Sequence, residues 1–151
     1  MLVTYPALFY YDDTEGENTV PYFVHFPDIE GSGTQGSSIT DAMAMGAEYL
    51  GMMVSHYIEN GEPVPQPSSI NSLSLIDNDP FKDDADFTLT YDLDKSFISL
   101  VTVDVAEYLG QQEPIKKTLT IPRWADKVGR ELGINFSQTL TKAIAERRLQ
   151  S

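Results

Sequence analysis

The chain has 151 residues, and because 41% of them are hydrophobic and 11% aromatic, a globular core is expected and wholesale disorder is excluded. It contains no cysteine, which excludes disulfides, thiolate metal sites and a thiol nucleophile. The net charge of −13 is unevenly divided: residues 1–113 contain two basic and 20 acidic residues, whereas residues 114–151 contain eight basic and three acidic ones.

Two β-type runs begin the chain. Leu2–Tyr11 is rich in Val, Tyr, Phe and Leu, and Thr19–Phe26 is again apolar, with the polar turn 12–18 between them. Two such runs around a turn that contains glycine predict a β-hairpin. A short extended stretch is expected over Ser32–Gly36.

A long amphipathic helix is predicted next. Ser38 followed by Asp41 resembles a capping box, and apolar residues then recur at spacings of three and four. Asn60 and Gly61 end the helix, and the prolines that follow force an extended exit.

The rest of the acidic part is expected to add strands. Ile70–Ile76 is a candidate short strand, and Phe87–Leu93 and Phe97–Val105 alternate well enough to be strands around a turn. The predicted class is α+β, with one main helix packed on a mostly antiparallel sheet. We expect an acidic unit over residues 1–109, a linker over 110–114 and a separate unit over 115–151.

The basic C-terminal segment predicts strand–helix–helix. Ile115–Ile121 alternates, Pro122 suits the first turn of a helix, and Gly133 suits its C-terminal end. Asn135 begins a second helix with a further capping pattern.

So short a segment cannot bury a sufficient core alone, and a lone strand leaves its edges unpaired. Pairing the strand with its copy in a second subunit solves both problems, so we expect a homodimer. Its core is predicted to consist of the apolar residues of this segment: Leu119, Ile121, Trp124, Val128, Leu140 and Ile144.

The opposite face of the paired strands would present Lys116, Thr118 and Thr120. A two-stranded ribbon fits the major groove of DNA, and the eight basic residues of the segment favour a polyanion. A solvated polar strand in a plain dimerisation tail is the alternative.

The stretches 117–122 and 132–140 resemble the ribbon-helix-helix family of the Arc and MetJ type. The resemblance implies that outward strand side chains contact bases and that the start of the second helix holds phosphate. The DNA-binding residues expected from the ribbon and from this resemblance are Lys116, Lys117, Thr118, Thr120, Asn135, Phe136 and Ser137.

The acidic part also resembles a known family. The stretch from Phe26 to Gly31, the stretch from Thr34 to Ala42, and the helix end with its proline-rich exit up to Ser68 are similar to the HicB antitoxins. The resemblance implies a partial RNase H-like domain that binds and silences a small basic HicA-like toxin, which cleaves mRNA. It also implies repression of the protein's own operon through operator DNA. A cytoplasmic protein is expected, because the N-terminus has neither a charged n-region nor an apolar h-region.

The residues expected to contact the toxin are Asp28, Glu30, Glu48 and Glu59, although Asp28 could equally cap a turn. Catalysis, a metal and a cofactor are not expected, because the first strand contains no acid and His25 and His56 have no partner at ligand spacing. No stretch reaches the roughly 18 apolar residues of a membrane span. Two alternatives stay open: a metal-dependent ribonuclease tethered to DNA, and a ligand-sensing repressor without a toxin partner.

Overall fold

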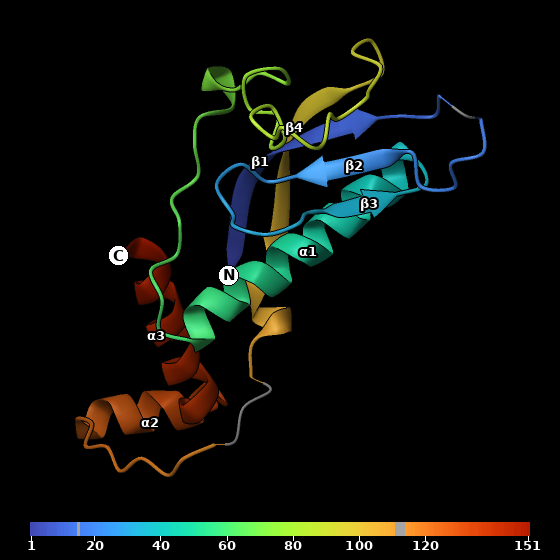
Figure 1. Cartoon of the computed structure of the whole chain (residues 1–151). Helices are drawn as coiled ribbons and strands as arrows, with labels where there is room; N and C mark the ends of the chain where they lie inside the picture. The colour runs from blue at the N-terminus through green and yellow to red at the C-terminus, as the bar shows by residue number, and fades with distance from the viewer. Residues whose placement is uncertain (15, 111–113) are drawn as a thin grey trace.

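The computed structural model describes residues 1–14, 16–110 and 114–151. Figure 1 shows an antiparallel sheet with a long helix across one face, and two shorter helices near the C-terminal end of that helix. The α+β class expected from the sequence is confirmed. Residues 111–113 of the expected linker lie outside the described residues.

Four strands form the sheet in the order β3-β2-β1-β4, and each neighbouring pair is antiparallel. They are β1 (Leu2–Tyr11), β2 (Tyr22–His25), β3 (Thr34–Gly36) and β4 (Phe97–Asp104). The hairpin expected from the first two runs is confirmed, with Leu8 opposite His25. Pairing with β2 begins only at Leu8, so Pro6, which has no amide to donate, has a strand neighbour only on the β4 side.

Helix α1 (Ile39–Glu59) begins and ends where the sequence indicates. The Ser38 hydroxyl accepts a hydrogen bond from the Asp41 amide at 3.0 Å, and Asn60 forms the C-terminal cap. The buried face of α1 packs against the sheet and contains the small residues Ala42 and Gly46 and the larger residues Leu50 and Val54. The small residues bring the helix close to the sheet, and the larger ones fill the core.

The side chains of β1 alternate between two buried faces. Tyr5, Ala7 and Phe9 join the core beneath α1, whereas Leu8 and Tyr10 point to the opposite face and are equally buried. That opposite face, called the outer face below, is covered by the irregular segment 69–96. Tyr10 contacts this segment directly: its ring meets Tyr91 edge to face, and its hydroxyl donates to the Leu75 carbonyl at 2.6 Å.

Two predictions of strands in this segment are wrong. Residues 70–76 contain the short 3₁₀ helix η1 (Ile70–Ser72) followed by turns, and residues 87–93 have no strand. Tyr91 of this run meets the Tyr10 ring of the outer face edge to face, and the Asp92 amide donates to the Tyr11 carbonyl at 2.8 Å, but no strand ladder continues from that bond. Both sides of β1 are already paired with β2 and β4, so β1 offers this run no free edge.

The C-terminal part continues from β4 through the 3₁₀ helix η2 (Val105–Tyr108) to α2 (Arg123–Glu131) and α3 (Phe136–Gln150). Tyr108 packs against Gly51 of α1, where an added Cβ would lie 2.4 Å from the ring. Leu149 of α3 packs against the core, and Ala145 is buried. The two helices predicted in the tail (residues 115–151) are confirmed, and α3 lies against the body (residues 1–109).

Candidate nucleic-acid and partner interfaces

The strand expected over residues 115–121 is not formed in the single chain, and every residue from Pro114 to Ile121 is exposed. The predicted strand required a second chain, so its pairing stays a prediction. Its side chains nevertheless divide into two sets. Ile115, Lys117, Leu119 and Ile121 line a groove beside α3, whereas Lys116, Thr118 and Thr120 are not part of that lining.

This groove, called the tail groove below, has a volume of about 610 Å³ and is completed by Phe136, Leu140 and Ala143 of α3. Its lining is mainly apolar, and Leu119 remains 58% exposed. The other predicted core residues of the tail are exposed as well, and Trp124 most of all, at 70%. So many exposed apolar side chains in one short segment are typical of a surface that another chain covers.

The expected phosphate-binding residues lie together at the N-terminus of α3. The Asn135 side chain accepts a hydrogen bond from the Gln138 amide at 3.1 Å, which confirms the predicted cap. Phe136 packs its ring on Gly129 of α2, where an added Cβ would lie 2.5 Å from the ring. Phe136 and Ser137 are exposed, and amides in the first turn of a helix have no acceptor within the helix. This end of α3 can therefore donate hydrogen bonds to an anion.

The acids expected to contact a toxin are not brought together. Asp28 accepts hydrogen bonds from the Ser68 amide, at 2.9 Å, and from the Ser68 hydroxyl, so it fixes the end of the proline-rich stretch to the turn after β2. Burial, followed by the charge of Asp28, raises the pKa of Tyr5 to about 12, and the Tyr5 hydroxyl donates to the Pro65 carbonyl. Asp28 therefore has a structural role here.

Glu30 and Glu48 are exposed, on the turn after β2 and on α1. Glu59 lies at the end of α1 in a hollow that Leu109 and the α3 residues Thr141, Ile144 and Ala145 also line. Its buried Oε1 atom has no hydrogen-bond partner among the described residues. Of the four expected acids, only Glu30 and Glu48 are thus fully open to a partner in the single chain.

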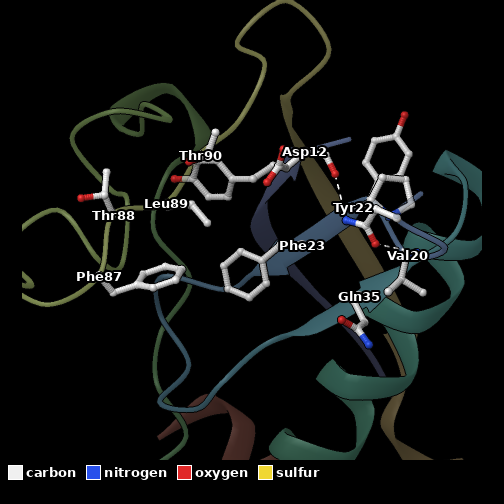
Figure 2. A pocket seen from close by; sticks show the side chains of 12 residues that line it. Asp12, Val20, Tyr22, Phe23, Gln35, Phe87, Thr88, Leu89 and Thr90 are labelled. Atoms are coloured by element: carbon white, nitrogen blue, oxygen red, sulfur yellow. Dashed lines mark hydrogen bonds between the residues drawn. The ribbon is translucent and has the colours of Figure 1, made fainter. Parts of the chain in front are cut away.

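The structure brings together a different set of residues that the sequence reasoning missed. A hollow of about 310 Å³ opens on the outer face, between the end of β1, the start of β2 and the segment 87–90. Figure 2 shows Phe23 at the middle of this hollow, with Phe87 and Leu89 to one side and Gln35 to the other. Tyr10 and Asp12 also line it. We call it the outer-face hollow.

The surroundings of the hollow affect two titratable groups. Burial, reinforced by the charge of Asp79, raises the pKa of Tyr10, so this hydroxyl stays protonated and serves as a donor. Burial lowers the pKa of His25 on β2, against the opposing effect of Asp79. His25 lies near Phe23, with ring centroids 6.4 Å apart, and is neutral at pH 7.

Among the described residues, no group of three or more His, Cys, Asp or Glu side chains is arranged to hold a metal ion. His25 and His56 lie on β2 and α1, on separate elements as expected. None of the helices in the described part of the chain combines the length and apolar character needed to cross a membrane.

Comparisons with known proteins give one family match and one highly similar solved chain. The model of a family described as HicB_like antitoxin of bacterial toxin-antitoxin system matches residues 4–76. A chain in the toxin-antitoxin complex from Streptococcus pneumoniae is 72% identical, with a TM-score of 0.72, over 97% of this chain and 99% of that one. No curated protein matches.

Two further solved structures are more distant. The Burkholderia pseudomallei antitoxin HicB is 26% identical, with a TM-score of 0.48, over 96% of this chain and 98% of its own. A chain of the HicA3 and HicB3 toxin-antitoxin complex is 20% identical, with a TM-score of 0.44, over 68% of this chain and 99% of that one.

Proposed function

The chain belongs to the HicB-like antitoxin family, and we propose that it neutralises a HicA-like mRNA-cleaving toxin and represses its own operon by binding operator DNA. In this proposal residues 1–109 bind the toxin, residues 110–114 form a linker, and residues 115–151 dimerise and bind DNA. The protein acts by binding, not by catalysis.

The observation that carries the toxin-binding role is the likeness to a chain of a toxin–antitoxin complex. The two chains are 72% identical over nearly the whole length of both, so the surface that meets a partner in one has a counterpart in the other.

The charge of the body supports the same role independently. A toxin that grips the phosphates of RNA must be cationic, and residues 1–113 carry 20 acidic residues against two basic ones. Opposite charges speed association and fix the orientation of a complex. We propose that the body covers the RNA-binding surface of the toxin, so that inhibition is occlusion.

The geometry of the tail supports DNA binding by a dimer. A second copy that pairs its residues 115–121 with those of the first would cover the tail groove and satisfy the unpaired backbone. Lys116, Thr118 and Thr120 are outside the groove lining and would then form the exposed face of a two-stranded ribbon. Such a ribbon enters the major groove, while the N-terminus of α3 holds a phosphate.

Co-expression with the small open reading frame adjacent to the gene tests the toxin-binding role. We expect a basic protein to copurify, and we expect the separated toxin to cleave RNA until the chain is added back. Failure of any basic protein to copurify would contradict the proposal and favour a repressor without a toxin partner. Degradation of RNA by the purified chain with Mg²⁺ or Mn²⁺ would instead favour a nuclease.

A further inference from the structure

We infer that the outer-face hollow is the place where the body receives an arginine or lysine side chain of the toxin. The inference rests on the proposed toxin binding and specifies its surface. It differs from the expectation that Asp28, Glu30, Glu48 and Glu59 make the contact.

The hollow has the size and lining for one long cationic side chain. Its volume of about 310 Å³ is at the lower end of the roughly 300–1,000 Å³ of small-molecule pockets. Phe23 and Phe87 present aromatic surface to it, and Asp12 contributes a carboxylate. Aromatic faces attract ammonium and guanidinium groups, and the aliphatic part of such a side chain packs well on apolar walls.

Acidic residues are concentrated around this hollow. Of the 20 acidic residues in residues 1–113, ten lie in the described parts of the segments 12–18 and 77–94, which adjoin the hollow or contribute to its lining. The same two segments contain one basic residue, Lys82. A cationic partner is therefore attracted to this part of the molecule more strongly than to the α1 side.

The neighbouring hollow already contains the kind of contact that we infer. Lys95 places its Nζ atom 5.0 Å from the centroid of the Tyr11 ring. Asp12, Asp13 and Asp92 line the same space. A basic side chain of this chain thus lies over an aromatic ring among carboxylates, immediately beside the hollow proposed for the toxin.

The acids on the other side of the sheet are less suited to this contact. Asp28 is engaged by the amide and the hydroxyl of Ser68, and Glu59 lies beneath α3. Displacing either from its present position would cost contacts that the fold already makes. Asp12 also accepts hydrogen bonds from the amide and the hydroxyl of Thr14, but both fall on Oδ1 and are local to the turn between β1 and β2, and Asp12 lines the hollow. The two bonds to Asp28 occupy both of its oxygens and join segments 40 residues apart.

The test is a double variant, Phe87→Ala with Asp12→Asn, titrated with the basic protein encoded beside the gene. Phe87 is 49% exposed, so its loss spares the core, and asparagine keeps the acceptor oxygen that binds Thr14. We expect the dissociation constant for the toxin to rise at least tenfold. Unchanged thermal unfolding and unchanged operator binding would show that the variant is folded.

Matched controls remove the same chemistry elsewhere. Glu30→Gln with Glu48→Gln removes exposed charge outside the hollow, and Leu2→Ala removes an exposed apolar side chain from the far end of β1. We expect the dissociation constant for the toxin to change less than twofold in each control. Normal binding by the double variant, with weakened binding by the glutamine pair, would overturn the inference and leave the proposed function intact. A wild-type chain that does not bind the toxin would overturn both.

Discussion

Replacing Leu119 with alanine should weaken the homodimer by about 30-fold. The perturbation acts on the tail groove, where Leu119 lies beside Phe136 and Leu140. If a second chain covers this groove, Leu119 loses its solvent exposure on dimerisation. Alanine leaves the backbone and the charge of the segment unchanged, so the effect isolates the apolar contact.

The magnitude follows from the exposure. Leu119 is 58% exposed in the single chain. Full burial of a leucine side chain contributes about 1.5–3 kcal/mol, so covering the exposed part contributes about 1 kcal/mol. A two-fold dimer contains the residue twice, which gives about 2 kcal/mol. Because about 1.4 kcal/mol corresponds to a factor of ten, the dissociation constant rises about 30-fold.

Sedimentation equilibrium over a dilution series measures that constant directly. Leu2→Ala is the matched control, since Leu2 is an exposed leucine of β1 outside the tail groove, and it should leave the constant unchanged. The Leu119 variant should also bind the operator more weakly than wild type, because fewer chains are dimeric and only a dimer presents a two-stranded ribbon. A wild-type chain that stays monomeric, or a Leu119 variant that dimerises normally, would refute the reasoning.

Three further outcomes are expected. Lys116→Ala with Thr118→Ala should abolish operator preference in a gel-shift titration while the dimer persists, since each lost base contact costs about 1–3 kcal/mol; unchanged preference would remove these residues from the interface. Glu59→Leu should raise the free energy of unfolding in urea by about 1 kcal/mol, because the buried Oε1 atom of Glu59 has no hydrogen-bond partner among the described residues. A lower free energy of unfolding in the variant would mean that this carboxylate stabilises the contact between α1 and α3. Burial lowers the pKa of His25 below 6.5, so protons bind more readily to the unfolded chain and the free energy of unfolding should fall as the pH drops below 6.5. In the His25→Gln variant this part of the pH dependence should be missing. Parallel plots of the free energy of unfolding against pH for wild type and variant would show that His25 is not its origin.

Local chemistry explains why α1 could be predicted to the residue. Ser38 and Asp41 mark its start through contacts within four residues, and Asn60 marks its end. The same holds for Asn135 at the start of α3. Such caps are readable from sequence because both partners are close in the chain.

The strands were predictable only where alternation coincided with a free backbone partner. Residues 97–104 found one in β1, whereas residues 87–93 alternate equally well and form no strand. Two of their aromatic side chains make contacts outside the sheet ladder instead, Tyr91 with Tyr10 and Phe87 with Phe81. Alternation reports burial of one face of a segment, and it does not report what covers that face.

The outer-face hollow could not be predicted because its residues are far apart in sequence. Asp12, Phe23 and Phe87 meet only through the register of β1 with β2 and the path of the segment 69–96. The concentration of acids in the segments 12–18 and 77–94 was a usable signal, because solvation alone does not require them to cluster. The tail groove was predictable because its apolar residues have nothing else in so short a segment to cover them.

We propose that one molecule keeps an anionic surface for a toxin and a cationic surface for DNA in separate parts of its chain. Titrating the chain into an RNA-cleavage assay of the purified toxin, with and without operator DNA, measures the first surface while the second is occupied. We expect cleavage to stop at a stoichiometric ratio in both cases. Continued cleavage at excess antitoxin, or relief of inhibition by the operator through displacement of the toxin, would contradict the claim.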